Sequence, residues 1–162
     1  MLTAFFFKET KNMELSDEIE IPGKRIDVFA KLIDPEILKE CIPGCEELCL
    51  TAENEYSAKV LLKIGPIKAR FSGSVTLDTT HAPESLTLSG AGEGGIAGFA
   101  KGGAEVELID EGEITTLKYQ AKAETGGKIA QLGSRLITST ARKLAKAFFQ
   151  SFETIMTGNK EA

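Results

Sequence analysis

Hydrophobic and polar residues alternate along most of the chain before residue 126, which is the pattern of β-strands with one buried face. The alternation begins at 14–21 and stops at Pro22-Gly23. It is clearest at 67–77, where one side carries Ile67, Ala69, Phe71, Val75 and Leu77. Turn signals such as Glu53-Asn54 and Asp110-Glu111-Gly112 separate the segments. The pattern predicts further strands near 46–50, 55–64, 85–92, 98–109 and 114–124.

Helical spacing appears in three places. Apolar residues at 24–33 recur at helical steps, and a second short helix is expected from Pro35 to about Glu40, with Asp34 as its N-cap. After Gly126-Gly127, one long helix is predicted from Lys128 to about Met156. Its apolar stripe comprises Ile129, Leu132, Leu136, Ile137, Leu144, Phe148, Phe152 and Ile155.

This order of elements predicts an α+β helix-grip fold. A curved, antiparallel, seven-stranded sheet would wrap around the long C-terminal helix, with two short helices after the first strand. The length of 162 residues suits one domain, expected at 13–157. Residues 1–12 are expected to be a poorly structured extension, with Met13 as the natural start, and 158–162 a short tail. The alternative for Phe5, Phe6 and Phe7 is a membrane-touching tip.

Small residues occupy the strand positions that should face the long helix. The inward sets are Gly90, Gly92, Gly98, Ala100, Gly102 and Ala104, followed by Ala121 and Ala123. Protein cores are normally filled to crystal-like density. Such a face therefore leaves two alternatives: close approach of the helix, or a hollow suited to an apolar ligand.

For the hollow, the predicted lining residues are Phe29, Leu38, Phe71, Leu88, Gly90, Phe99, Gly102, Ala121, Leu132 and Leu136. The entrance is expected between the short helices and the loop at 93–99, because these are the irregular pieces of the fold. A bulky side chain at Gly102 or Ala121 is expected to fill the hollow and reduce ligand binding more than it reduces stability.

Composition and charge narrow the classes of function. The net charge of −5 argues against nucleic acid as the main partner. No apolar stretch approaches the roughly 20 residues of a membrane span, and the start of the chain lacks the charged region of a secretory signal. These features predict a cytoplasmic protein.

The sequence offers little catalytic or metal-binding chemistry. Cys41, Cys45 and Cys49 are interrupted by Pro43-Gly44, and the single histidine, His81, lies far away in a predicted turn. The glycine run at 90–95 lacks the strand-to-helix context of a phosphate loop. We therefore predict neither a catalytic nor a metal site, and expect three charges to be solvated rim residues: Glu93, Lys101 and Lys128.

Four spaced motifs resemble the carbon monoxide dehydrogenase G-subunit (CoxG) family. They are DPEILKECIPGCE at 34–46, KIGPIKARFSG at 63–73, GAGEGGIAGFAKGGA at 90–104 and GGKIAQLGSRLI at 126–137. The resemblance covers about 13–152. It implies a START-like, polyketide cyclase-like fold with a deep apolar cavity, and so favours the hollow over close packing.

The resemblance also implies a role. It is that of a non-enzymatic accessory protein of an aerobic molybdenum-containing CO dehydrogenase, or of a related molybdenum hydroxylase. Such a protein would bind a quinone or lipid without a covalent cofactor and help to recruit the enzyme to the inner face of the cytoplasmic membrane through peripheral contact. The alternatives are a cyclase or aromatase-like enzyme and an assembly or maturation factor. Many family members continue into a membrane-reaching tail, whereas this sequence stops six residues after Met156. Anchoring by such a tail is therefore not expected here.

Overall fold

The computed structural model describes residues 10–158 as one sheet, three α-helices and two 3-10 helices. In chain order the elements are β1 (Thr10–Pro22), α1 (Arg25–Leu32), α2 (Pro35–Cys41), β2 (Cys45–Ala52), β3 (Glu55–Ile64), β4 (Ile67–Asp78), β5 (Ser85–Glu93), η2 (Gly95–Ala97), β6 (Phe99–Asp110), β7 (Ile114–Gly126), η3 (Gly127–Leu132) and α3 (Ser134–Thr157). The predicted strands and the two predicted short helices are all present. Because β1 begins at Thr10, the expected domain boundary at Met13 falls inside a strand. The extension at 1–9 and the tail at 159–162 lie outside the described residues.

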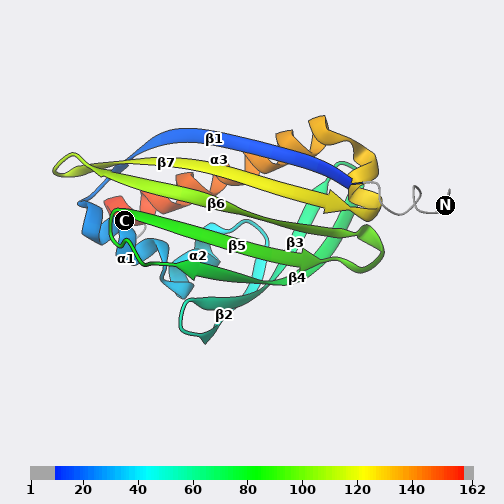
Figure 1. Cartoon of the computed structure of the whole chain (residues 1–162), viewed down its shortest axis with the longest axis horizontal. Helices are drawn as coiled ribbons and strands as arrows, with labels where there is room; N and C mark the ends of the chain where they lie inside the picture. Colours follow the sequence, from blue (N-terminus) through cyan, green and yellow to red (C-terminus); the bar gives the residue numbers. More distant parts are fainter. Residues whose placement is uncertain (1–9, 159–162) are drawn as a thin grey trace.

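The seven strands form one antiparallel sheet in the order β1-β7-β6-β5-β4-β3-β2. The first strand of the chain, β1, therefore pairs with the last strand, β7. The long helix α3 crosses one face of the sheet behind β1 and β7, while α1 and α2 lie at one end of the same face (Figure 1). The predicted helix-grip architecture is confirmed.

Local chemistry explains the helix boundaries. The side chain of Asp34 accepts a hydrogen bond from the amide of Glu36 at 2.9 Å, and Pro35 occupies the first turn of α2, as predicted. The prediction of one unbroken helix from Lys128 was wrong. Gly133 adopts φ +94° between η3 and α3, a left-handed conformation that no α-helix continues through.

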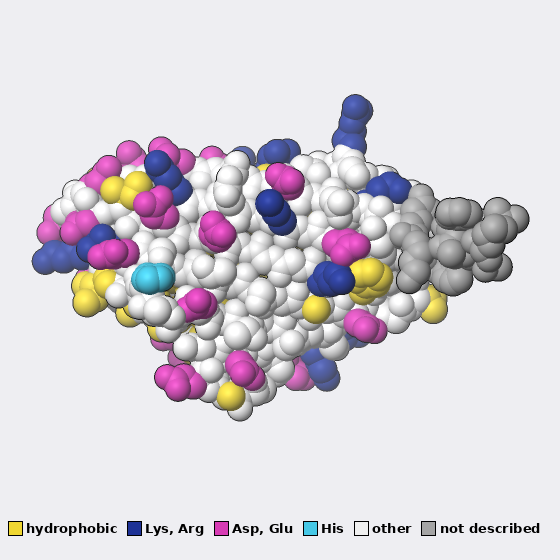
Figure 2. Space-filling model, viewed as in Figure 1, with side chains coloured by type: hydrophobic (Ala, Val, Ile, Leu, Met, Phe, Trp, Pro, Cys, Tyr) yellow, Lys and Arg dark blue, Asp and Glu magenta, His cyan; other side chains and the backbone are white. Residues whose placement is uncertain are grey.

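The outer face of the sheet is polar. It carries paired charges such as Lys118 with Glu18 at 3.5 Å and Lys59 with Glu47 at 3.9 Å. Figure 2 views the protein from this side and shows acidic and basic side chains scattered between small polar groups. The apolar side chains therefore face α3. None of the described helices combines the length and apolar character needed to cross a bilayer.

Candidate functional site

The middle of the inner face is a floor of small residues on β5 and β6. Strand register places Gly90 opposite Gly102, Gly92 opposite Ala100 and Ala104 between Leu88 and Ala121. We call Gly90, Gly92, Ala100, Gly102 and Ala104 the floor. None of these five residues is fully buried, although all lie on the face of the sheet toward α3. The predicted inward alternation of small residues is confirmed at these positions.

The hydrophobic core is divided around this floor into three clusters. The α1 cluster holds Ile21, Val28, Phe29, Leu32, Cys41, Tyr56, Leu77, Leu86, Leu108, Leu117 and Phe152. The η3 cluster, at the opposite end, holds Ile64, Phe71, Ala97 and Ile129. The β1 cluster, along one edge, holds Met13, Leu15 and Ile137. Tyr119 packs against both the α1 and the β1 clusters, whereas none of the five floor residues belongs to any of the three clusters.

The long helix α3 lies over the floor, and its buried residues are near its two ends. Only Ile137 and Phe152 of α3 are buried. The stretch between them carries apolar residues that are all only half-buried, namely Ala141, Leu144, Ala145, Ala147, Phe148 and Phe149. The middle of α3 therefore meets the sheet through half-buried side chains, with Ala141 and Ala145 against the β1 cluster and Phe148 and Phe149 against the α1 cluster.

Close packing of α3 onto the glycines does not account for the floor. A Cβ atom built on Gly90 would first meet the carbonyl of Ser74 in β4, and one on Gly102 would first meet the carbonyl of Lys122 in β7. The nearest neighbours of these glycines belong to adjacent strands and not to α3. The helix instead runs closest to β1 at one edge of the sheet and to α2 and β3 at the other.

Nine of the ten predicted lining residues belong to the floor, or lie in or against one of the three clusters. The α1 cluster includes Phe29, with Leu38 and Leu88 packed against it. The η3 cluster includes Phe71, with Leu132 and Leu136 packed against it. Ala121 packs on the β1 cluster, and Gly90 and Gly102 belong to the floor. That these residues line a ligand cavity remains a prediction.

Phe99 does not lie on the inner face, contrary to the prediction. It pairs in register with Gly126, and its neighbour Ala100 occupies the inward position. The ring of Phe99 covers Gly126, where an added Cβ would meet its Cε2 atom. Strict alternation along β6 therefore turns this aromatic ring outward.

The predicted entrance was also wrong. The short helices lie at the end of the sheet where β6 turns into β7, because α1 approaches both strands there. The loop from β5 to β6 lies at the opposite end, beside η3 (Figure 1). Successive hairpins of an antiparallel meander turn at opposite ends, so these two irregular segments frame no common opening.

Polar groups on the inner face are few and mostly neutral. Tyr56 donates a hydrogen bond to the carbonyl of Ile33 at 2.5 Å, and burial, followed by Asp34, raises its pKa. Burial also raises the pKa of Tyr119; Asp17 raises it further and Arg142 lowers it. Both phenols therefore remain protonated at neutral pH, and act as hydrogen-bond donors rather than as general bases.

Tyr119 was not among the predicted lining residues. Its ring stacks on Phe149 of α3, with centroids 5.7 Å apart, and its hydroxyl makes no hydrogen bond with another described residue. Cross-strand register pairs it with Asp17, a polar exception between the inward residues Leu15 and Ile19 of β1. That exception was the available signal, whereas the stacking partner depends on the rotation of α3.

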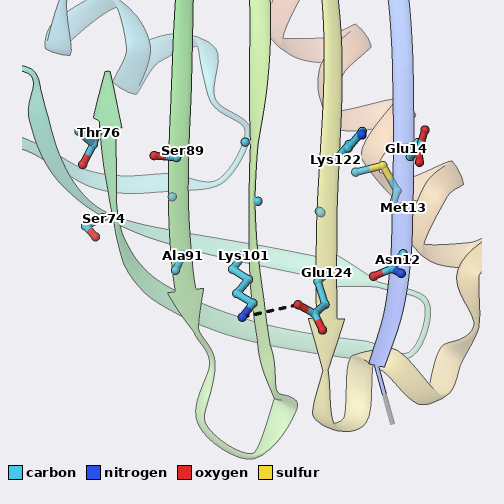
Figure 3. Close-up of a pocket in the computed structure, with 14 residues that line it drawn as sticks. Asn12, Met13, Glu14, Ser74, Thr76, Ser89, Ala91, Lys101, Lys122 and Glu124 are labelled. Carbon is cyan, nitrogen blue, oxygen red and sulfur yellow. Dashed lines mark ion pairs between the residues drawn. The ribbon is translucent and has the colours of Figure 1, made fainter. Parts of the chain in front are cut away.

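The described surface is hollowed on the other side of the sheet. A depression of about 720 Å³ extends over β1, β7, β6, β5 and β4. In Figure 3 its polar lining includes Ser74, Thr76 and Ser89, together with Lys101, which lies 3.5 Å from Glu124. Since α3 and the hydrophobic clusters lie behind it, this depression is a solvated trough. Glu93, Lys101 and Lys128 are exposed and solvated, as predicted, but Glu93 and Lys101 occupy outward positions of β5 and β6 and do not border the inner face.

The cysteines form no metal centre with other described residues. Cys41 is buried at the end of α2, whereas Cys45 and Cys49 lie on β2. Burial raises the pKa of the Cys45 thiol, which keeps it protonated and a weak nucleophile.

Comparisons with known proteins agree with this architecture. The family model of the carbon monoxide dehydrogenase G-subunit (CoxG) matches residues 18–156. A conserved protein of Geobacillus kaustophilus has a solved structure that is 32% identical, with TM-score 0.84, covering 91% of this chain and 96% of that one. No curated protein sequence matches the chain.

More distant solved structures share the fold alone. A START superfamily protein from Mycobacterium smegmatis is 12% identical, with TM-score 0.70, covering 90% of this chain and 97% of that one. The Zhui aromatase/cyclase from Streptomyces sp. R1128 is 9% identical, with TM-score 0.68, covering 92% and 94%. The predicted START-like, polyketide cyclase-like fold is confirmed.

Proposed function

The chain belongs to the CoxG family of carbon monoxide dehydrogenase, and from this membership we propose that it is a non-enzymatic accessory protein of an aerobic, molybdenum-containing CO dehydrogenase or a related molybdenum hydroxylase. In this role it holds an apolar ligand between the sheet and α3 and helps the enzyme to meet the cytoplasmic membrane. The observation that carries the ligand part is the floor, whose residues belong to none of the three clusters and remain incompletely buried.

The lining favours an apolar molecule with few polar atoms. Aliphatic and aromatic side chains of the α1 and η3 clusters bound the space, and the floor between them offers no charged group. The hydroxyl of Tyr119, which has no partner among the described residues and is kept protonated by burial, is suited to donate one hydrogen bond to a carbonyl oxygen. An isoprenoid quinone, or a lipid of similar shape, combines a long apolar body with carbonyl groups.

The inner face gives less support to catalysis. The structural neighbours include an aromatase/cyclase and norcoclaurine synthase, so the fold does carry enzymes. On the inner faces of the strands, however, Tyr56 is committed to a backbone carbonyl and Tyr119 lies beside Asp17 at the β1 edge. General acid–base catalysis needs groups poised near neutral pH and directed at one point, and two phenols with raised pKa values do not provide them.

The test is recovery of the ligand with the protein. Chain purified from its host without detergent is expected to release a quinone or lipid into organic solvent, identified by mass spectrometry, and to retain a molybdenum hydroxylase during affinity purification. Protein isolated repeatedly without any apolar molecule, and unable to take up added menaquinone or ubiquinone, would refute the ligand role. Turnover of an aromatic or polyketide substrate would instead favour the enzyme.

A further inference from the structure

Basic residues are concentrated in the last part of the chain. Between Glu124 and Glu153 the sequence contains no acidic residue and five basic ones: Lys128, Arg135, Arg142, Lys143 and Lys146. The whole chain has a net charge of −5, so the remaining sequence carries −10. Such segregation within one small domain places an electropositive surface on an otherwise acidic protein.

Helical geometry gathers these charges on the exposed side of α3. Arg135, Arg142 and Lys146 are seven and four residues apart, which puts them in line on one face over about 16 Å. All three are exposed, as are Lys128 and Lys143. None of the five makes an ion pair with another described residue, whereas lysines of the sheet pair with carboxylates.

An exposed apolar side chain lies at the start of this basic surface. Ile96, in η2, is 85% exposed, and η2 packs beside η3, which carries Lys128 and leads directly into α3. The next residue, Ala97, is buried against Ile129 and fixes the loop in place. Ile96 is thus held in solvent beside the segment that carries Lys128 and leads into the basic face of α3. Surfaces that bind at a lipid interface combine exposed apolar side chains with cations in this way.

We propose that the exposed face of α3, together with Lys128 and Ile96, docks the protein onto an anionic lipid bilayer. This inference rests on the membrane part of the proposed function and names the surface and lipid charge involved. Cations without a protein partner gain by approaching anionic headgroups, and Ile96 gains by leaving water. An acidic protein surface would complement the charges but would leave Ile96 without a role, which favours the bilayer.

The test measures binding of the whole chain to vesicles by co-sedimentation. Vesicles with equal parts phosphatidylglycerol and phosphatidylcholine are expected to bind the protein, and pure phosphatidylcholine vesicles to leave it in solution. The triple variant Arg135→Gln, Arg142→Gln, Lys146→Gln is expected to bind anionic vesicles about 100-fold more weakly, at about fivefold per charge. Ile96→Ser should weaken binding about tenfold, and high salt should weaken it for the wild-type protein.

The matched control removes three lysines elsewhere. Lys24→Gln, Lys59→Gln, Lys118→Gln makes the same change in net charge at exposed sites outside α3, and should weaken binding less than about fivefold, the effect of a single charge. Equal losses in both triple variants, or no binding to anionic vesicles, would overturn the proposal. The proposal would also be overturned if the protein self-associated at low salt and only the triple variant of α3 abolished this association. The basic face would then bind a second copy of the chain. We expect the same variants to release as much apolar ligand into organic solvent as the wild-type protein. Loss of vesicle binding with ligand retained therefore concerns the docking surface alone, whereas absence of ligand from every variant and from the wild-type protein concerns the ligand role.

Discussion

Replacing Phe152 with alanine is expected to lower the free energy of unfolding by about 3–5 kcal/mol. Phe152 is fully buried near the C-terminal end of α3, within the cluster that joins this helix to α1 and to six strands. Its ring lies 6.1 Å from that of Phe148, in a stacked arrangement. Removing it would leave a large cavity where the helix is most firmly attached to the sheet. Chemical denaturation monitored by circular dichroism measures the change.

Phe149→Ala provides the comparison for Phe152. Phe149 is only half-buried, and it packs against the α1 cluster from its outside while stacking on Tyr119. Its replacement is expected to cost about 1–2 kcal/mol, because less apolar area returns to water. If Phe149→Ala destabilised the protein as much as Phe152→Ala, the centre under α3 would be as well packed as the α1 cluster, and no hollow would exist there.

Gly102→Ala is expected to destabilise the protein by about 2–3 kcal/mol, the effect of overpacking against a backbone that cannot yield. An added Cβ would clash with the carbonyl oxygen of Lys122 and lie 2.8 Å from Cα of Ala123. The sequence-based expectation that a bulky residue here would mainly fill the hollow was therefore wrong. The glycine is required by the close approach of β7.

Gly92→Ala is the matched control on the same floor. Its added Cβ would meet its nearest neighbours at 3.6–4.0 Å, which are ordinary contacts. We expect a change within about 0.5 kcal/mol, or slight stabilisation from the less flexible unfolded chain. Thermal unfolding of the two variants side by side should separate them clearly, and equal behaviour would contradict the strand geometry described for β6 and β7.

The fold could be predicted from sequence because each element carries its own local signal. Alternation, turn residues and the capped helix at Asp34-Pro35 fix the order of elements, and the long apolar stripe requires a sheet to cover. The small residues at Gly90, Gly92 and Gly102 also fall on the inner face, as alternation requires.

Other features depend on geometry that residue patterns do not contain. Gly133 lies within the continuous helical spacing of apolar residues that the sequence shows. Its positive φ nevertheless ends η3 at Leu132, and α3 begins at Ser134. Phe99 was assigned to the cavity from its size, although alternation from Ala100 already turned it outward. The pairing of Tyr119 with Phe149 depends on how α3 is rotated about its axis, and no local rule specifies that rotation.

An apolar ligand in the space between the floor and α3 is the central proposal for this protein. Ala104 lies on the floor, half-buried and outside all three clusters, whereas Ala91 is exposed on the outer face of β5. The most direct measurement is the dissociation constant of a short-chain quinone for the wild-type protein, Ala104→Phe and Ala91→Phe. We expect Ala104→Phe to weaken binding at least about tenfold, or about 1.4 kcal/mol, and Ala91→Phe to leave it unchanged. Unchanged binding to folded Ala104→Phe, or equal losses in both variants, would contradict a ligand in this space.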